Sequence, residues 1–413
     1  MKTKALSVAG LLAISFIFVT CEKQPVEPDL TPKLIELTPA ATQVISAGNE
    51  FGIELFTKVA EAENKNFMLS PLSASTALTM LLNGCGGNTF TQLRSTLKYP
   101  SGMQSEDINE TYKSLVDQLL KADPKVTFAL ANAIFYRLGF SVKAQFINTI
   151  KENFKAKIEG LDFDSPSALN TINKWASDNT NGKITKVLDQ ISHETVMFIM
   201  NALYFRGDWS YQFDKSKTTD LPFYPDNLPE VRVSTMNGET GAKIVYGEEY
   251  KAIEMPYGRT NFTMIVIVPE SGLKSFHESF NAELWNSLTS EFDEMKEFGK
   301  RIVFFPKFRF SYEKVLNDQL KAMGMVDAFI SYVADLSGIS DAEIFVSFVK
   351  QNTFVEVDEK GTEAAAVTTI GVELTSMTPQ PEQFIIDRSF IFAIRERTTN
   401  TLLFIGQVVN PKE

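Results

Sequence analysis

The sequence predicts an α+β fold, with helices concentrated in the first half of the chain and strands in the second. Three observations support this. Amphipathic helical spacing recurs before residue 180, runs rich in Phe, Val, Ile and Tyr dominate afterwards, and helices and strands do not alternate as in βαβ units. The chain has 413 residues, 44% of them hydrophobic, which is enough for one large domain or two ordinary ones.

The N-terminus has the pattern of an export signal. Lys2 and Lys4 precede a mostly apolar run over residues 5–19, which is too short to span a membrane. Cys21 follows the apolar run and resembles the lipidated cysteine of bacterial lipoproteins. We therefore expect residues 1–20 to be a lipoprotein signal peptide and the exported protein to be lipid-anchored to the cell envelope, at the surface or facing the extracellular space. Ordinary cleavage nearby, with an incidental cysteine, is the alternative.

The next segment predicts a tether. Residues 22–43 contain four prolines and mixed charge, which is typical of a linker. Together with Cys21 they make a flexible tether over residues 21–43. The pattern is then globular to the end, with no internal repeat and no second linker, so residues 44–413 are predicted to be one domain.

Four helices are predicted from apolar spacing and caps. The first covers roughly residues 46–62. The second begins with Ser70 as cap and Pro71 in the first turn, and stops at Gly84. The third covers roughly 107–121, and the fourth covers the run "PSALNTINKWASDNT".

Seven strands are predicted from runs of β-branched and aromatic residues. They lie over residues 128–137, 195–207, 262–269, 301–310, 352–359, 390–396 and 401–409. The run "MIVIV" within 262–269 is apolar throughout, so we expect this strand to be buried on both faces.

Composition argues against an enzyme and against nucleic-acid binding. The net charge is −11, and Lys and Arg are spread along the chain without a basic stripe. Cys85 follows a helical run, where packing among small residues is expected. His193 and His277 are the two histidines, both interpreted as surface residues, and no nucleophile or metal motif lies near them. We expect no catalytic residue, metal or cofactor.

The stretch "EVDEKGTEAAAVTT", residues 356–369, has an unusual pattern. If it continues as a strand, Thr362, Ala364, Ala366 and Thr368 point one way, and all four are small and uncharged. The charge of Glu363 lies on the other side. This pattern suits a segment that slides between two strands of a sheet. The alternative is a surface loop that contains a run of alanines.

Motifs along the whole chain resemble the serpin family of serine protease inhibitors. "EVDEKGTEAAAVTT" resembles the hinge of the serpin reactive loop. "NFMLSPLSASTALTMLLNG", "INKWASDNTNGKITKVL", "NALYFRGDWSYQF", "ADLSGIS" and "FIFAIRERTTNTLLFIGQVVNP" resemble further serpin segments, in family order from about residue 45 to 411.

The resemblance implies an architecture and a set of site residues. The architecture is three β-sheets, eight or nine helices and an exposed reactive loop. The hinge residues would be Glu359, Gly361, Thr362, Glu363, Ala364, Ala365 and Ala366. The residues that control opening of the main sheet would be Ser70, Ser73, Asn201, Trp209 and Gln351. Gln351 stands where the family usually has His, which argues against a pH-sensitive opening at this point.

The resemblance also places the cleaved bond. The usual seventeen residues counted from Glu359 put it between Thr375 and Ser376, with Leu374 and Met377 as the nearest alternatives. The absence of Arg and Lys between Gly361 and Asp387 disfavours trypsin-like targets. We expect a monomer that inhibits elastase-like or subtilisin-like serine proteases through a covalent complex, with cysteine proteases as secondary targets. A non-inhibitory binding serpin is the alternative.

Overall fold

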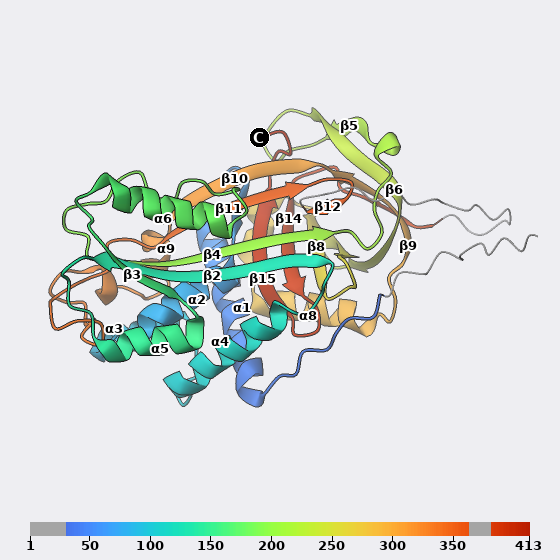
Figure 1. Cartoon of the computed structure of the whole chain (residues 1–413). Helices are drawn as coiled ribbons and strands as arrows, with labels where there is room; N and C mark the ends of the chain where they lie inside the picture. The colour runs from blue at the N-terminus through green and yellow to red at the C-terminus, as the bar shows by residue number, and fades with distance from the viewer. Residues whose placement is uncertain (1–29, 363–380) are drawn as a thin grey trace, which may run out of the picture.

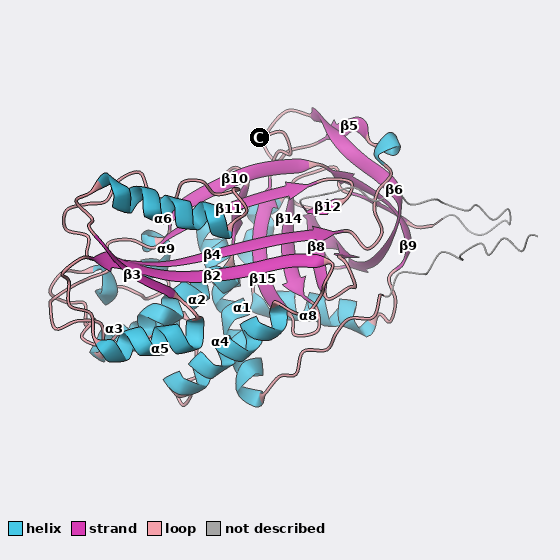
Figure 2. Cartoon of the chain, in the orientation of Figure 1, coloured by secondary structure: helices cyan, strands magenta, loops and turns pink. Residues whose placement is uncertain are grey.

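The computed structural model describes residues 30–362 and 381–413. Within these residues it has nine α-helices, which lie mainly at one end and along one side of the molecule (Figure 1). Their bounds are α1 Pro39–Ala60, α2 Pro71–Leu82, α3 Gly87–Thr96, α4 Ser105–Leu119, α5 Ala144–Phe154, α6 Pro166–Asn179, α7 Leu273–Ser279, α8 Ala282–Glu294 and α9 Asn317–Ala322. The strands extend toward the other end (Figure 2).

The main sheet has six strands in the order β10-β11-β12-β4-β2-β3. These are β2 Val126–Arg137, β3 Lys157–Leu161, β4 Met197–Asp208, β10 Phe308–Val315, β11 Lys350–Val357 and the two-residue β12 Gly361–Thr362. Helix α6 lies across the outer face of this sheet and packs on β2 and β4 through Ile172 and Trp175 (Figure 1).

The remaining strands form a second, nine-stranded arrangement that divides at the long strand β6. The bounds are β1 Phe67–Leu69, β5 Thr219–Phe223, β6 Val231–Tyr246, β7 Tyr250–Pro256, β8 Phe262–Pro269, β9 Gly299–Pro306, β13 Gln383–Ile385, β14 Phe390–Glu396 and β15 Thr401–Val408. The first part of β6 pairs with β5 and β9, and its end pairs with β7. Two sheets therefore share one strand, which with the main sheet makes the three sheets predicted.

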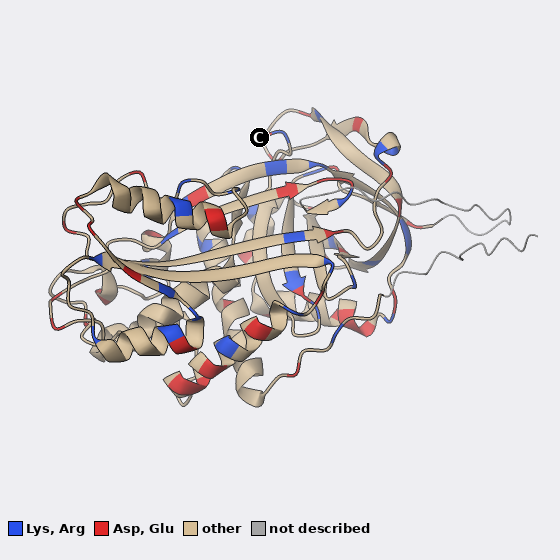
Figure 3. Cartoon of the chain, in the orientation of Figure 1, with Lys and Arg blue, Asp and Glu red and all other residues tan. Residues whose placement is uncertain are grey.

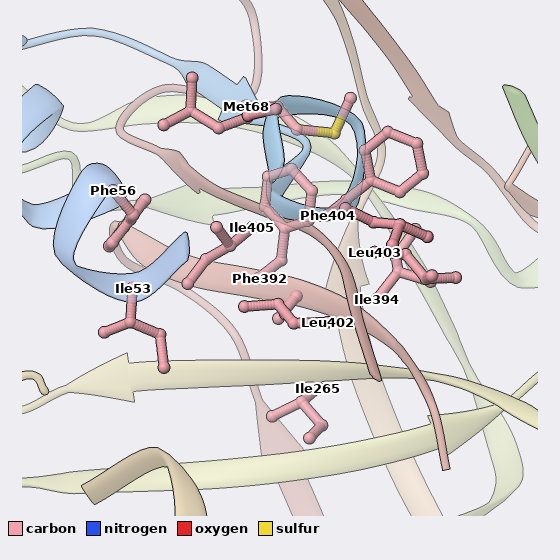
Figure 4. Close-up of a cluster of buried hydrophobic side chains, with 14 of the residues drawn as sticks. Ile53, Phe56, Met68, Ile265, Phe392, Ile394, Leu402, Leu403, Phe404 and Ile405 are labelled. Carbon is pink, nitrogen blue, oxygen red and sulfur yellow. The ribbon is translucent and has the colours of Figure 1, made fainter. Parts of the chain in front are cut away.

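The hydrophobic core lies where α1 and α2 meet strands β14, β15 and β8. Ile53 and Phe56 of α1 face Phe392 and Ile405 of two adjacent strands (Figure 4). Every residue of β8 is buried, as the apolar run in this segment predicted.

Several sequence predictions are confirmed at the level of single elements. Ser70 caps α2, and its hydroxyl accepts a hydrogen bond from the Ser73 N–H. The fourth predicted helix corresponds to α6, and the third to α4 within two residues at each end.

Three predicted boundaries are wrong. Helix α1 begins at Pro39, seven residues before the prediction, because Thr38 caps it and a proline suits the first turn. The segment from residue 30 to 38 packs against the domain, so the tether ends before residue 30 instead of at 43. The predicted strand 301–310 is two strands, β9 and β10, which enter different sheets on either side of Pro306 and Lys307.

The interpretation of His277 as a surface residue is also wrong. It is half-buried, its Nε2 lies 2.8 Å from Gln407 Oε1, and its ring lies edge-on to Phe56. The neighbouring Phe276 of α7 is buried, and the contacts of His277 are with α1 and β15. His193 is exposed, as predicted, and lies 2.8 Å from Asp164.

Because His277 is half-buried, we expect the stability of the folded protein to fall on acidification. Burial lowers the pKa of His277, although the Gln407 hydrogen bond opposes this. The unfolded chain takes up a proton on His277 at a higher pH than the folded protein does, so protonation favours unfolding. The stability that neutral His277 contributes is therefore complete above about pH 6.5 and falls on acidification. We expect wild type to lose more thermal stability than His277→Gln between pH 7.5 and 5.5. His193→Gln is the control, and an equal loss in wild type and His277→Gln would contradict the prediction.

A buried charge network joins the sheets to α8. The side chains of Arg395 and Glu254 are fully buried and 2.7 Å apart. Arg395 also lies 2.7 Å from Asp293, whose side chain is 40% exposed, and donates to Asn400. Lys243, also buried, donates to the Phe292 carbonyl. Because the partners of Arg395 come from β7, α8 and the β14–β15 turn, the network fixes how these elements pack.

No helix within the described ranges is long and apolar enough to cross a membrane.

Candidate functional site

The candidate site is a seam in the main sheet between β4 and β11. Strand β12 pairs with both of them at one end, through Val357↔Thr362 and Thr362↔Gly207. Beyond β12, β4 and β11 share no ladder among the residues that the structure describes. Among the described residues, the gap between these two strands is therefore bridged by two residues at one end, while β4 keeps its ladder with β2 and β11 its ladder with β10.

Cavities follow this seam. A small one of about 20 Å³ lies beside Thr362 between Tyr204 and Val355, and a larger one of about 260 Å³ continues toward α2. The larger cavity is lined by both strands, by Trp175 and Ala176 of α6, and by the segment 343–349. An extended segment that continued β12 along this seam would lie between β4 and β11.

Gly361 allows the chain to enter the sheet at this point. Its φ of +153° is a conformation that side chains rarely adopt, and an added Cβ would lie 2.1 Å from the Gly207 carbonyl oxygen. A turn precedes it, in which the Asp358 carboxylate accepts from the Lys360 N–H. The backbone therefore reverses after β11 and starts a new strand against β4.

Aromatic and hydroxyl groups hold the inserted end. The Thr362 hydroxyl and the Tyr257 hydroxyl are 2.6 Å apart and buried. The Tyr257 ring stacks on Trp209 with centroids 4.4 Å apart, and the Trp209 indole N–H donates to the Asp358 carbonyl. Trp209 thus lies at the end of the main sheet that carries the hinge. Tyr257 was not predicted, because "MPYG" gives no local sign of a partner 105 residues away.

Glu359 is held beside the hinge end of the main sheet by hydrogen bonds and an ion pair. Its carboxylate accepts hydrogen bonds from Lys307 Nζ at 2.8 Å and from the Thr218 hydroxyl at 2.8 Å. Burial opposes ionisation of Glu359, but these hydrogen bonds outweigh it and lower its pKa below the usual value. Lys307 lies between β9 and β10, so the ion pair ties the hinge to the junction of two sheets.

Polar groups of α2 and β11 meet at the far end of the seam. Gln351 donates from Nε2 to the Ser70 carbonyl at 2.8 Å and accepts from the Ser70 N–H at 3.2 Å. The Ser70 hydroxyl donates to the Leu403 carbonyl. Gln351 therefore binds β11 to α2 through an amide, and no titratable group takes part in this contact. Ser73 is half-buried and lines the large cavity.

Asn201 lies across the cavity on β4. The Asn201 Nδ2 donates to Asn132 Oδ1 at 2.6 Å. Asn132 in turn donates from its own Nδ2 to the Phe154 carbonyl. The Asn201 Oδ1 is buried and has no hydrogen-bond partner within residues 30–362 and 381–413. The structure thus brings Ser70 and Gln351 into contact, while Asn201 faces the same cavity from the opposite strand.

The contact between Gln351 and Ser70 predicts a graded effect on stability. Gln351→Leu removes both hydrogen bonds and leaves the Ser70 N–H buried, which should lower the free energy of unfolding by about 2–3 kcal/mol. Thr353→Val removes one neighbouring bond, from the Thr353 hydroxyl to the Met68 carbonyl, and should cost about 1 kcal/mol. Urea unfolding measures both values. Equal losses of unfolding free energy in the two variants would show that the paired hydrogen bonds of Gln351 stabilise the fold no more than the single bond of Thr353.

The remaining predicted residues fall into two groups. Glu363, Ala364, Ala365, Ala366, Thr375, Ser376 and Cys21 lie outside the described residues. Cys85 packs against the core, and its thiol donates to the Leu81 carbonyl. Burial, with a smaller effect of Asp335, raises the pKa of Cys85 to about 12, so the thiol is not ionised near neutral pH. The described residues contain no cluster of His, Cys, Asp and Glu that could hold a metal ion.

Comparisons with known proteins agree with this geometry. The family model for serpins, serine protease inhibitors, matches residues 46–411. Leukocyte elastase inhibitor of Xenopus laevis is 34% identical over 382 residues, covering 89% of this chain and 99% of the relative. The native structure of the thermophilic serpin tengpin matches with a TM-score of 0.81 at 28% identity, covering 92% of this chain and 96% of tengpin.

A binding protein is also among the similar structures. Human thyroxine-binding globulin, solved with its hormone, matches with a TM-score of 0.81 at 27% identity, over 91% of this chain and all of the globulin. The family match covers most of the chain. The chain belongs to the serpin family.

Proposed function

We propose that this protein is an irreversible, suicide-substrate inhibitor of serine proteases with elastase-like or subtilisin-like specificity. The observation that carries the proposal is the hinge. Gly361 and Thr362 already occupy the first two positions of a strand between β4 and β11, and the seam continues beyond them as far as Gln351.

The chemistry proceeds through an ordinary acyl-enzyme. The serine hydroxyl of the protease attacks the carbonyl of Thr375, the amide bond to Ser376 breaks, and the new amine of Ser376 leaves with the proton that the protease supplies. The N-terminal part of the loop is then free at its cleaved end. It can extend β12 along the seam, with the protease attached to Thr375.

The energy of insertion is sufficient to disable a protease. About a dozen new strand residues would each form hydrogen bonds worth about 1 kcal/mol net, or about 10 kcal/mol in total. This is comparable with the stability of a typical domain. A deformed protease active site would hydrolyse the acyl bond slowly, which makes the complex persistent.

The hinge sequence supports insertion. The small, uncharged residues at Thr362, Ala364 and Ala366 can be buried between two strands, whereas a charge at these positions would be costly.

The residues before the cleaved bond support the specificity. Thr375, or Leu374, in front of the cleaved bond suits elastase-like and subtilisin-like proteases. The similarity to leukocyte elastase inhibitor points the same way. Cysteine proteases are proposed as secondary targets, and cell-envelope anchoring through Cys21 as the location.

Incubation with pancreatic elastase tests the proposal. We expect a complex that survives denaturing electrophoresis, together with a released C-terminal peptide that begins at Ser376. A peptide that begins elsewhere would move the cleaved bond and keep the mechanism. Cleavage without a complex by elastase, subtilisin and papain alike would overturn inhibition and favour the binding-protein alternative.

A further inference from the structure

The segment that precedes α1 is held against the domain as an extended strap, residues 30–38. Two side-chain amides each form hydrogen bonds with both the backbone N–H and the backbone carbonyl of one strap residue. Asn261 accepts from the Lys33 N–H and donates to the Lys33 carbonyl, both at 2.8 Å. Gln118 does the same for Glu36, with both bonds at 3.1 Å. Asn261 is fully buried, so this end of the strap has a rigid support.

The strap leads the chain to the end of the molecule that carries the hinge (Figure 1). The Leu30 carbonyl accepts a hydrogen bond from Thr260, and the Thr260 N–H donates to the carbonyl of Tyr257, whose side chain holds Thr362. Leu30, the first described residue, therefore lies close to the hinge.

Cations from separate parts of the sequence gather around the strap. Lys33 Nζ donates to the Lys121 carbonyl, which places Lys33 beside the end of α4. The carboxylate of Asp123 is buried and accepts from the backbone N–H groups of Lys125 and Arg259. Figure 3 shows basic segments, interspersed with acidic ones, near the ends of β2 and β4 on this side. Such a cluster is notable in a chain with a net charge of −11.

Two exposed leucines lie among these cations. Leu34 is 76% exposed and Leu120 is 40% exposed. The strap runs beside the end of α4 over this stretch, since residues 33 and 36 contact residues 121 and 118. We define the strap face as Lys33, Leu34, Leu120, Lys121, Lys125 and Arg259; it carries both basic and apolar side chains, and the acidic Glu36 is exposed beside it.

We propose that the strap face is a docking surface for an anionic lipid bilayer. Basic side chains are attracted to the negative surface potential of such a membrane, and exposed leucines can enter its interface. A polyanion such as nucleic acid or a sulfated polysaccharide would use the cations but would leave the leucines without a partner.

The chain outside the described residues fits this occupant. Nine peptide links join Cys21 to Leu30, and they can span at most about 30 Å. If Cys21 carries the lipid, the strap face lies within that distance of the bilayer. A single acyl chain gives weak binding, and a polybasic patch is one of the second signals that make it stable. The consequence is that the hinge end of the inhibitor is presented close to the membrane.

Sedimentation with vesicles tests this without any protease, so the result is independent of the proposed inhibition. The protein is the chain from Glu22 with no lipid, which retains every described residue. We expect at least a hundredfold tighter binding to phosphatidylcholine vesicles with 30% phosphatidylglycerol than to phosphatidylcholine alone. Each cation near an anionic surface contributes about fivefold, so K33Q/K121Q/K125Q should weaken binding by about a hundredfold.

A matched variant controls for overall charge. Lys174, Lys186 and Lys300 have side chains that are 74%, 63% and 79% exposed and lie on other elements. K174Q/K186Q/K300Q makes the same change in net charge and should bind as wild type does. Leu34→Ser should weaken binding by about tenfold without a change in charge.

Three results would overturn the proposal. These are equal binding to neutral and anionic vesicles, equal losses in the two triple variants, and failure to bind vesicles together with retention on a heparin column that depends on Lys33, Lys121 and Lys125. The last result would assign the surface to a soluble polyanion.

Discussion

Thr362→Arg is expected to convert the inhibitor into a substrate. Thr362 is 5% exposed and is enclosed between β4 and β11, with its hydroxyl 2.6 Å from that of Tyr257. An arginine there would have to bury a charge without a partner or keep the hinge out of the sheet. In either case insertion slows, and the acyl-enzyme is hydrolysed before the protease is trapped.

The expected result is at least a tenfold fall in the fraction of inhibitor that forms a stable complex with elastase, while cleavage of the loop continues. Ala364→Asp should have the same effect, since alternation places it on the same side as Thr362. Glu363→Arg is the matched control, because residue 363 alternates to the opposite side. Full inhibition by Thr362→Arg, or an equal loss in Glu363→Arg, would refute insertion of the hinge.

Glu254→Gln should have the largest effect on stability. The carboxylate of Glu254 is the fully buried partner of Arg395, and it also faces Lys243 at 3.8 Å. Removal of its charge leaves a buried guanidinium with only the partly exposed Asp293 as a charged partner. We expect a loss of about 3–5 kcal/mol in the free energy of unfolding.

Asp293→Asn is the control for Glu254→Gln. Both carboxylates lie 2.7 Å from Arg395, but the side chain of Asp293 is 40% exposed. Its loss should cost no more than about 1 kcal/mol, because solvent screens an exposed pair. Urea unfolding of the two variants measures the difference. Equal costs would mean that burial does not determine the strength of these pairs.

Much of the fold could be predicted because its signals are local. The cap formed by Ser70 with Pro71, the apolar spacing of α6 and the uniformly apolar β8 each depend on residues a few positions apart. The short helix α9 offered too few turns for a periodic pattern, and the α1 start was hidden among prolines that also suit a linker.

The site was predictable only in part because its partners are distant in sequence. Ser70, Asn201, Trp209 and Gln351 came from family resemblance, and the structure shows what each contacts. Tyr257 and Lys307 have no sequence motif of their own, and they join the hinge only through the folding of β7, β9 and β10 around it. The strap face has the same origin, since its cations lie in three separate segments and form no stripe along the chain.

Comparison of the intact and the loop-cleaved protein tests the central claim most directly. The claim is that the free loop completes the seam between β4 and β11. Cleavage within the loop by a non-target protease, followed by thermal unfolding, should raise the unfolding midpoint by ten degrees or more, because about 10 kcal/mol of new strand pairing is gained. An unchanged or lower midpoint in the cleaved protein would contradict insertion, and with it the proposed mechanism of inhibition.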